Sequence, residues 1–103
     1  MIKNSTACRR AAKLLSKPGK WTRWAFARDK NGRETDADGS RSASFCLLGS
    51  VEHCKGDLHK VSDLHMEEYG FPASSFNDEK AKSRHDVCKR LRRLAQLLEK
   101  EGD

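Results

Sequence analysis

The chain has 103 residues, of which 36% are hydrophobic and 35% are charged, and its formal net charge is +6. This length allows one domain, residues 1–103, with a thin core, and no apolar run approaches the ~18 residues of a membrane-spanning helix. The first residues lack the apolar stretch of a secretory signal. We therefore expect a cytoplasmic protein with no membrane contact, whose four cysteines remain thiols.

The first predicted element is a helix at about residues 5–16. Apolar side chains recur at helical spacing between Ala7 and Leu15, and Pro18 and Gly19 then end the helix.

A strand at about residues 23–28 precedes Asn31-Gly32, a strong signal for a tight hairpin turn. Asp29 can fix this turn through its carboxylate. The residues after the turn are so polar that they predict only a weak hairpin arm or an extended loop.

Residues 42–54 are the least polar run of the chain and predict a buried second helix. Gly49 in its middle destabilises a helix by about 1 kcal/mol relative to Ala, so we expect this glycine to pack closely against another backbone. A third helix at about residues 58–68 ends at Gly70-Phe71-Pro72, because the residue before a proline avoids the helical region.

After a loop, in which Asp78 can act as a helix cap, the last helix is predicted at about residues 80–101. These elements indicate an α+β fold, mostly α, with about four helices packed as one small domain and one short β-hairpin. The first, second and fourth predicted helices should pack together, with Trp24 and Phe76 closing one end of the core. The last helix is predicted from one apolar stripe, made of Val87, Leu91, Leu94, Ala95 and Leu98.

Charge is distributed unevenly along the chain. Residues 1–33 carry ten Lys or Arg against one Asp, residues 34–79 carry three against ten acids, and residues 80–103 carry eight against four. The basic ends either dock on the acidic middle or converge into one positive face that attracts an acidic partner or a polyanion. The predicted partner-binding residues are basic: Arg9, Arg10, Lys13, Arg23, Arg28, Lys89, Arg90, Arg92 and Arg93.

Three short motifs lie between Trp21 and about Leu98. They read Trp24-Ala25-Phe26-Ala27-Arg28-Asp29 with Gly32-Arg33, Cys46-Leu47-Leu48-Gly49-Ser50, and Phe76-Asn77-Asp78. With them the chain resembles a family of small uncharacterised bacterial and phage proteins, in which a tryptophan usually stands at the position of Phe76. The resemblance implies an accessory protein of a bacterium or its virus, such as a phage-encoded modulator or inhibitor of a host defence complex.

Cys46 is the residue most typical of a reactive site. A cysteine near a helix N-terminus has a lowered pKa, and His85 as base with Asn77 or Asp78 as orienting group would complete a cysteine-nucleophile set. The alternative is a small buried apolar residue, which we favour because no cysteine-hydrolase signature surrounds it. For Arg28 and Asp29, and for Asn77 and Asp78, a structural role is likewise favoured over a pocket.

Four possible zinc ligands lie within thirteen residues: His53, Cys54, His59 and His65. Their spacing matches no zinc finger, and no phosphate-binding glycine motif occurs, so we predict neither a metal nor a cofactor.

The predicted function is a small non-enzymatic accessory binding protein that acts through its basic surface on an acidic protein or a protein–nucleic-acid complex. Direct binding of DNA or RNA is the alternative, since Trp21, Trp24 and Phe26 interleave with basic residues. A cysteine-dependent enzyme is a distant third.

Overall fold

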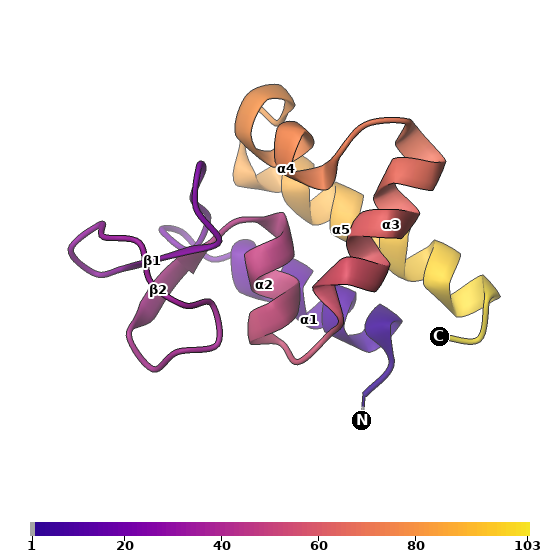
Figure 1. Cartoon of the computed structure of the whole chain (residues 1–103), viewed down its shortest axis with the longest axis horizontal. Coiled ribbons are helices and arrows are strands. Elements are labelled where there is room, and N and C mark those ends of the chain that lie inside the picture. The colour runs from indigo at the N-terminus through magenta and orange to yellow at the C-terminus, as the bar shows by residue number, and fades with distance from the viewer. Residues whose placement is uncertain (1) are drawn as a thin grey trace.

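The computed structural model describes residues 2–103 and has the predicted α+β architecture, mostly helical (Figure 1). No helix among these residues combines the length and the apolar character needed to span a membrane. The elements, in chain order, are α1 (Asn4–Leu15), β1 (Ala27–Asp29), β2 (Ser42–Phe45), α2 (Leu47–His53), α3 (Leu58–Tyr69), α4 (Ala73–Ser75), the π-helical segment η1 (Phe76–Lys80) and α5 (Arg84–Lys100).

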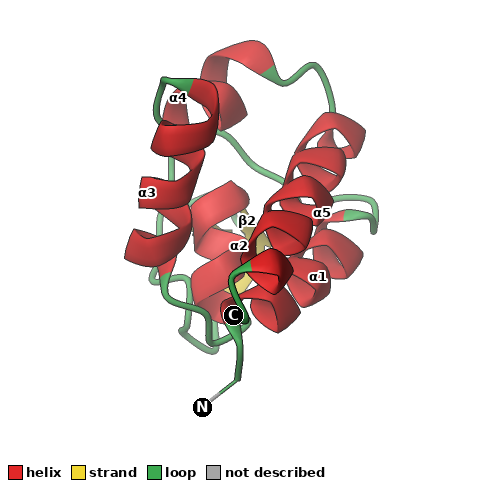
Figure 2. Cartoon of the chain, turned by 90° about the vertical axis from the view of Figure 1, so that its right-hand side faces the viewer, coloured by secondary structure: helices red, strands yellow, loops and turns green. Residues whose placement is uncertain are grey.

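Helix α1 packs against both α2 and α5, as predicted for the first, second and last helices. The α1 and α5 helices run antiparallel and side by side (Figure 2), since Asn4 and Ser5 bond Asp103 at one end and Arg84 bonds the Ser16 carbonyl at the other. Helix α2 packs against α1 and α3, and α3 also contacts α5 directly.

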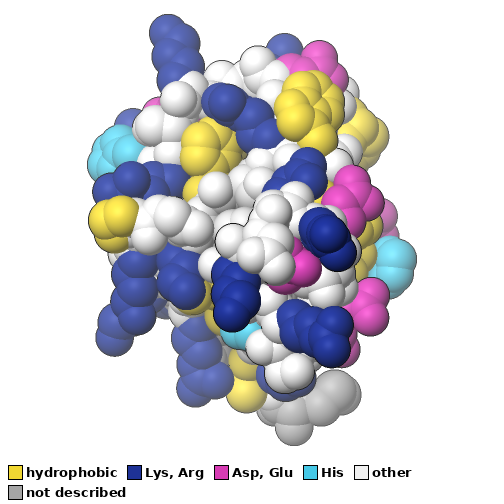
Figure 3. Space-filling view, turned by 90° about the vertical axis from the view of Figure 1, so that its left-hand side faces the viewer, with side chains coloured by type: hydrophobic (Ala, Val, Ile, Leu, Met, Phe, Trp, Pro, Cys, Tyr) yellow, Lys and Arg dark blue, Asp and Glu magenta, His cyan; other side chains and the backbone are white. Residues whose placement is uncertain are grey.

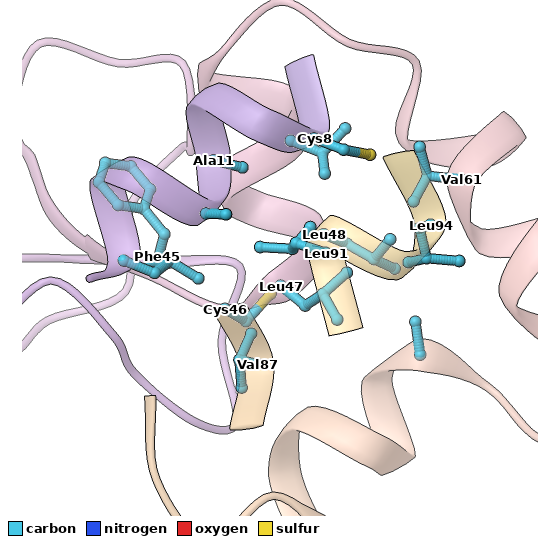
Figure 4. Packing of buried hydrophobic residues seen from close by; sticks show 14 of the residues in the cluster. Cys8, Ala11, Phe45, Cys46, Leu47, Leu48, Val61, Val87, Leu91 and Leu94 are labelled. Carbon is cyan, nitrogen blue, oxygen red and sulfur yellow. The ribbon is translucent and has the colours of Figure 1, made fainter. Parts of the chain in front are cut away.

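The core forms where these helices meet. Each contributes apolar side chains at helical spacing, and the largest of them are fully buried. Figure 4 shows the contributions of α1, α2 and α5 gathered at one place, with Phe45 at the end of β2 beside them. The residues labelled from these elements include Cys8, Ala11, Leu47, Leu48, Leu91 and Leu94.

The prediction of one helix over residues 42–54 is wrong in its first part. Ser42–Phe45 is strand β2, which pairs antiparallel with β1 through Ala27–Phe45 and Arg28–Ser44. Helix α2 begins only after Cys46, whose extended backbone (φ −81°, ψ −179°) stands at its N-cap. A short apolar run fits a strand as well as a helix. Here Ser42–Phe45 is a strand because β1 has an edge with which it can pair.

The turn at Asn31-Gly32 forms as predicted, and the Asp29 carboxylate fixes it by accepting from the backbone N–H groups of Asn31 (2.8 Å) and Arg33 (3.0 Å). The arm after the turn is weak, because it meets β1 in a single bridge, between Arg28 and Glu34. The sheet partner of β1 is therefore the later strand β2.

Gly49 packs against another backbone, as expected. A Cβ atom added there would overlap the carbonyl oxygen of Phe26. This contact fixes the distance between α2 and the chain segment that leads into β1.

Three predictions about the core and the last loop are wrong. Trp24 does not close the core, because 62% of its surface is exposed, whereas Phe76 is buried as expected. The predicted loop after Pro72 contains α4 and η1. Asp78 therefore lies inside η1 instead of capping the last helix, and α5 begins after Ser83.

Candidate docking site

Two aromatic side chains stand out of the surface in the segment between α1 and β1. Trp24 is 62% exposed and Phe26 is 51% exposed. Figure 3 views the molecule from the side of the sheet and shows hydrophobic side chains emerging among many Lys and Arg side chains. Large exposed aromatics of this kind are typical of interaction sites.

The backbone holds Trp24 in an unusual conformation. Its φ of +67° lies in the left-handed region, which destabilises a residue with a Cβ by roughly 1–2 kcal/mol. The Trp24 N–H donates to Asp78 Oδ1 at 2.9 Å, across 54 residues of sequence. Asp78 thus fastens the backbone of Trp24 to η1.

Asn77, which is fully buried, ties the same segment to the core. Its Oδ1 accepts from Trp21 Nε1 (2.7 Å) and from the Leu47 backbone N–H (3.0 Å). Its Nδ2 donates to the Thr22 carbonyl (3.1 Å) and to Asp78 Oδ1 (2.9 Å). One amide therefore joins three segments, and these are the three that carry the sequence motifs.

Trp24 and Phe26 border a hollow of about 310 Å³. Cys46, 7% exposed, lies in its wall. The lining holds two carboxylates and no Lys or Arg: it consists of Trp24, Ala25, Phe26, Glu34, Cys46, Ser74 and Asp78.

Cys46 is held as a protonated thiol. Burial raises its pKa, and the Asp78 charge raises it further, whereas the α2 amides of Gly49 and Leu48 lower it. The effect of the helix N-terminus is present but burial outweighs it. The favoured interpretation of Cys46 as a small buried residue therefore fits its environment, and the reactive-site alternative lacks the lowered pKa that it needs. Cys46 Sγ accepts from the Gly49 N–H at 3.2 Å instead of meeting an imidazole, and His85 lines a separate hollow beside α1.

The four residues considered as zinc ligands do not form a site. His53 Nδ1 bonds the Ala37 carbonyl (2.8 Å), His65 is buried against Phe71, and His59 is exposed. Residues 2–103 contain no group of three or more His, Cys, Asp or Glu side chains arranged to hold a metal ion.

The two basic ends of the chain lie together, because α1 and α5 are neighbours. Between residues 2 and 103 only two ion pairs form, Arg9 with Glu99 (2.8 Å) and Arg93 with Glu68 (4.0 Å). Only the second links a basic end to the acidic middle. The acidic middle therefore leaves most of these cations unpaired.

The predicted partner-binding residues fall into two groups. Arg9, Arg10, Lys13, Lys89, Arg92 and Arg93 are exposed on α1 and α5. Arg23, Arg28 and Arg90 are partly buried and make structural contacts. Arg23 Nη2 donates to the Ala81 carbonyl (2.6 Å), and Arg28 donates to Thr22 Oγ1 and to the carbonyls of Arg23 and Gly32.

His65 is a core residue that the sequence interpretation considered only as a possible zinc ligand. It is fully buried, and it occupies the place in α3 one turn after the buried Val61. This four-residue spacing is the feature of the sequence that could have indicated that His65 is buried. Met66, the next residue of α3, is 46% exposed.

Comparison with known proteins assigns neither a family nor a function to the chain. No family model matches the chain, and no curated protein or solved structure matches it either. The resemblance to small bacterial and phage proteins therefore stays a prediction.

Proposed function

We propose that this chain is a non-enzymatic binding protein of the cytoplasm that docks onto an acidic protein partner through Trp24, Phe26 and the basic residues around them. The proposal depends mainly on one observation, which is the way in which the structure exposes Trp24. Its ring is exposed on a left-handed backbone that Asp78 and, through it, Asn77 hold in place. Strained conformations maintained by several contacts cluster at functional sites.

An aromatic side chain held in this way is suited to be a binding anchor. Trp and Tyr are enriched among the few interface residues that contribute 2 kcal/mol or more, and a backbone that is already fixed loses little conformational entropy on binding. Phe26 extends the apolar area, and the position of its backbone is fixed by the close approach of Gly49. The hollow between them offers space for one side chain of the partner.

The acidic character of the partner follows from the cations beside the aromatic segment. The loop that joins β1 and β2 borders a hollow of about 610 Å³, with Lys30, Arg33 and Arg41 in its lining. Asp29 is the acidic residue of that lining, and its carboxylate already accepts two backbone N–H groups. The surplus of positive charge there would steer an acidic surface toward the aromatic anchors.

The test begins with affinity capture of the partner from host lysate, followed by measurement of its dissociation constant with purified variants. Trp24→Ala should weaken binding by about 30-fold or more, the equivalent of 2 kcal/mol. Met66→Ala is the matched control, since Met66 is also an exposed large hydrophobic residue but lies on α3. A partner that binds the Trp24→Ala and wild-type proteins equally would refute the proposal.

Direct nucleic-acid binding is the second candidate, and the pairing of α1 with α5 favours it. Their basic side chains lie on neighbouring helices, with a hollow of about 350 Å³ between Ser16 on one side and Arg84 and Arg92 on the other. Binding there would weaken steeply with salt, because phosphate contacts release counterions. Lys13→Glu with Arg92→Glu would abolish it and Trp24→Ala would not, so the two candidates predict opposite outcomes for the same variants.

A further inference from the structure

Arg90 of α5 is held between two aromatic rings. Its Cζ lies 3.7 Å from the centroid of the Tyr69 ring and 3.9 Å from that of Phe76. A guanidinium stacked in this way is stabilised over the negative faces of the rings. The stacking occupies the faces of the guanidinium, whereas its N–H donors point outward from its edge.

A buried histidine restricts the rotation of the Arg90 guanidinium between the two rings. The Phe71 carbonyl lies 2.9 Å from His65 Nδ1 and can only accept, so Nδ1 carries the ring proton and Nε2 is free to accept. Arg90 Nη1 lies 3.0 Å from Nε2 and donates to it. Burial and the Arg90 charge hold the pKa of His65 below its usual value, which keeps the ring neutral and able to accept.

The other donors of Arg90 are not used within residues 2–103. The ion pairs found there do not include Arg90. Its Nε and Nη2 make no hydrogen bond within that part of the chain, and neither atom is completely buried. An arginine whose position is fixed by three contacts thus presents free donors to solvent.

These donors face a hollow of about 330 Å³ that has an excess of positive charge. Tyr69 and Phe76 form its apolar part, and Lys89 and Arg93 line it together with Arg90. Asp86, the acidic residue of the lining, accepts from the Lys82 backbone N–H at 2.9 Å.

From this geometry we infer that Arg90 is the centre of a preformed oxyanion site, which takes a carboxylate or phosphoryl group of a protein partner. Arginine binds both groups through two parallel N–H···O bonds, and a guanidinium held rigid beforehand loses little freedom when it does so. The inference rests on the proposed function, because it supplies the chemistry by which an acidic partner is recognised. Segment η1 contributes to both sites, since Phe76 lines this hollow while Asp78 bonds the backbone of Trp24.

The experiment follows the Arg90 Nε–Hε signal of the whole chain by NMR during titration with two probes, inorganic phosphate and acetylated hexaglutamate. We expect a saturable shift of this signal, and the probe that binds more tightly tells a phosphoryl group from a carboxylate. Arg90→Lys keeps the charge but loses the planar pair of donors, so it should weaken binding at least about tenfold.

Lys100→Arg is the matched control, because Lys100 lies exposed on the same helix and outside this lining, and the substitution keeps its charge; its probe affinity should be unchanged. An Arg90 signal that moves with neither probe would overturn the inference, and so would equal weakening by the two substitutions, which would indicate general charge attraction. The wild-type signal remains decisive if Arg90→Lys does not fold. Because the probes are small, failure of this site is separate from failure of Trp24-dependent partner binding.

Discussion

The left-handed backbone at Trp24 makes a quantitative prediction for two substitutions, Trp24→Gly and Trp24→Ala. Both remove the whole ring, so both lose the same ring contacts. Because Trp24 is 62% exposed, its buried part is roughly 95 Å² of about 250 Å², and its loss destabilises each variant by about 2 kcal/mol.

The two variants differ only in the Cβ atom at φ +67°. That atom destabilises the left-handed conformation by roughly 1–2 kcal/mol, and the greater freedom of glycine in the unfolded chain offsets about 0.5–1 kcal/mol of this. Trp24→Gly should therefore be more stable than Trp24→Ala by about 1 kcal/mol, or roughly 4–8 °C in Tm for a domain of this size.

Urea unfolding followed by far-ultraviolet circular dichroism measures this difference. The control is Ala25→Gly, since residue 25 has no positive φ and glycine there should destabilise the fold by about 0.5–1 kcal/mol. If Trp24→Ala proves as stable as Trp24→Gly or more so, the backbone is not held in the left-handed region and the reasoning about strain fails.

Four further predictions concern other residues. Lys55→Gly should stabilise the fold by about 1 kcal/mol in urea unfolding, because Lys55 also has a positive φ (70°); a loss of stability would contradict this. Gly49→Ala should destabilise the fold by about 2–3 kcal/mol, since its Cβ would overlap the Phe26 carbonyl; unchanged thermal unfolding would argue against that contact. His65 binds its proton less readily in the folded than in the unfolded chain. Stability should therefore be full above pH ~6.5 and fall below it by at most about 1.4 kcal/mol per pH unit, a slope that His65→Gln should remove. Burial raises the pKa of Cys46, so iodoacetamide should alkylate it much more slowly in the folded than in the urea-unfolded chain; rapid alkylation would revive the enzyme hypothesis.

Much of the fold was predictable where one physical pattern dominates the local sequence. The apolar stripe from Val87 to Leu98 indicated the last helix, and Asn31-Gly32 indicated its turn. Gly49 was informative because a glycine inside an apolar helix needs a reason, and close approach of a backbone is the usual one. Each of these signals depends on a few residues that lie near one another in the chain.

The rest depends on contacts between distant segments. Ser42–Phe45 is a strand because β1 lies beside it, and a short apolar run by itself does not distinguish the two structures. Trp24 is exposed, and its backbone N–H donates to Asp78, 54 residues away, whereas composition alone places a tryptophan in the core. The charge pattern indicated basic ends, but only the packing of α1 against α5 established that these ends meet.

The four hydrogen bonds of Asn77 have a consequence for the order of folding. Three of them join residues 30 to 56 positions apart in sequence, and contacts of this kind form only after long chain segments have been brought together. The aromatic anchors therefore take up their final orientation late, once α2 and η1 have reached their places. An incompletely folded molecule would lack the surface that we assign to partner recognition, so binding itself would report that the chain has finished folding.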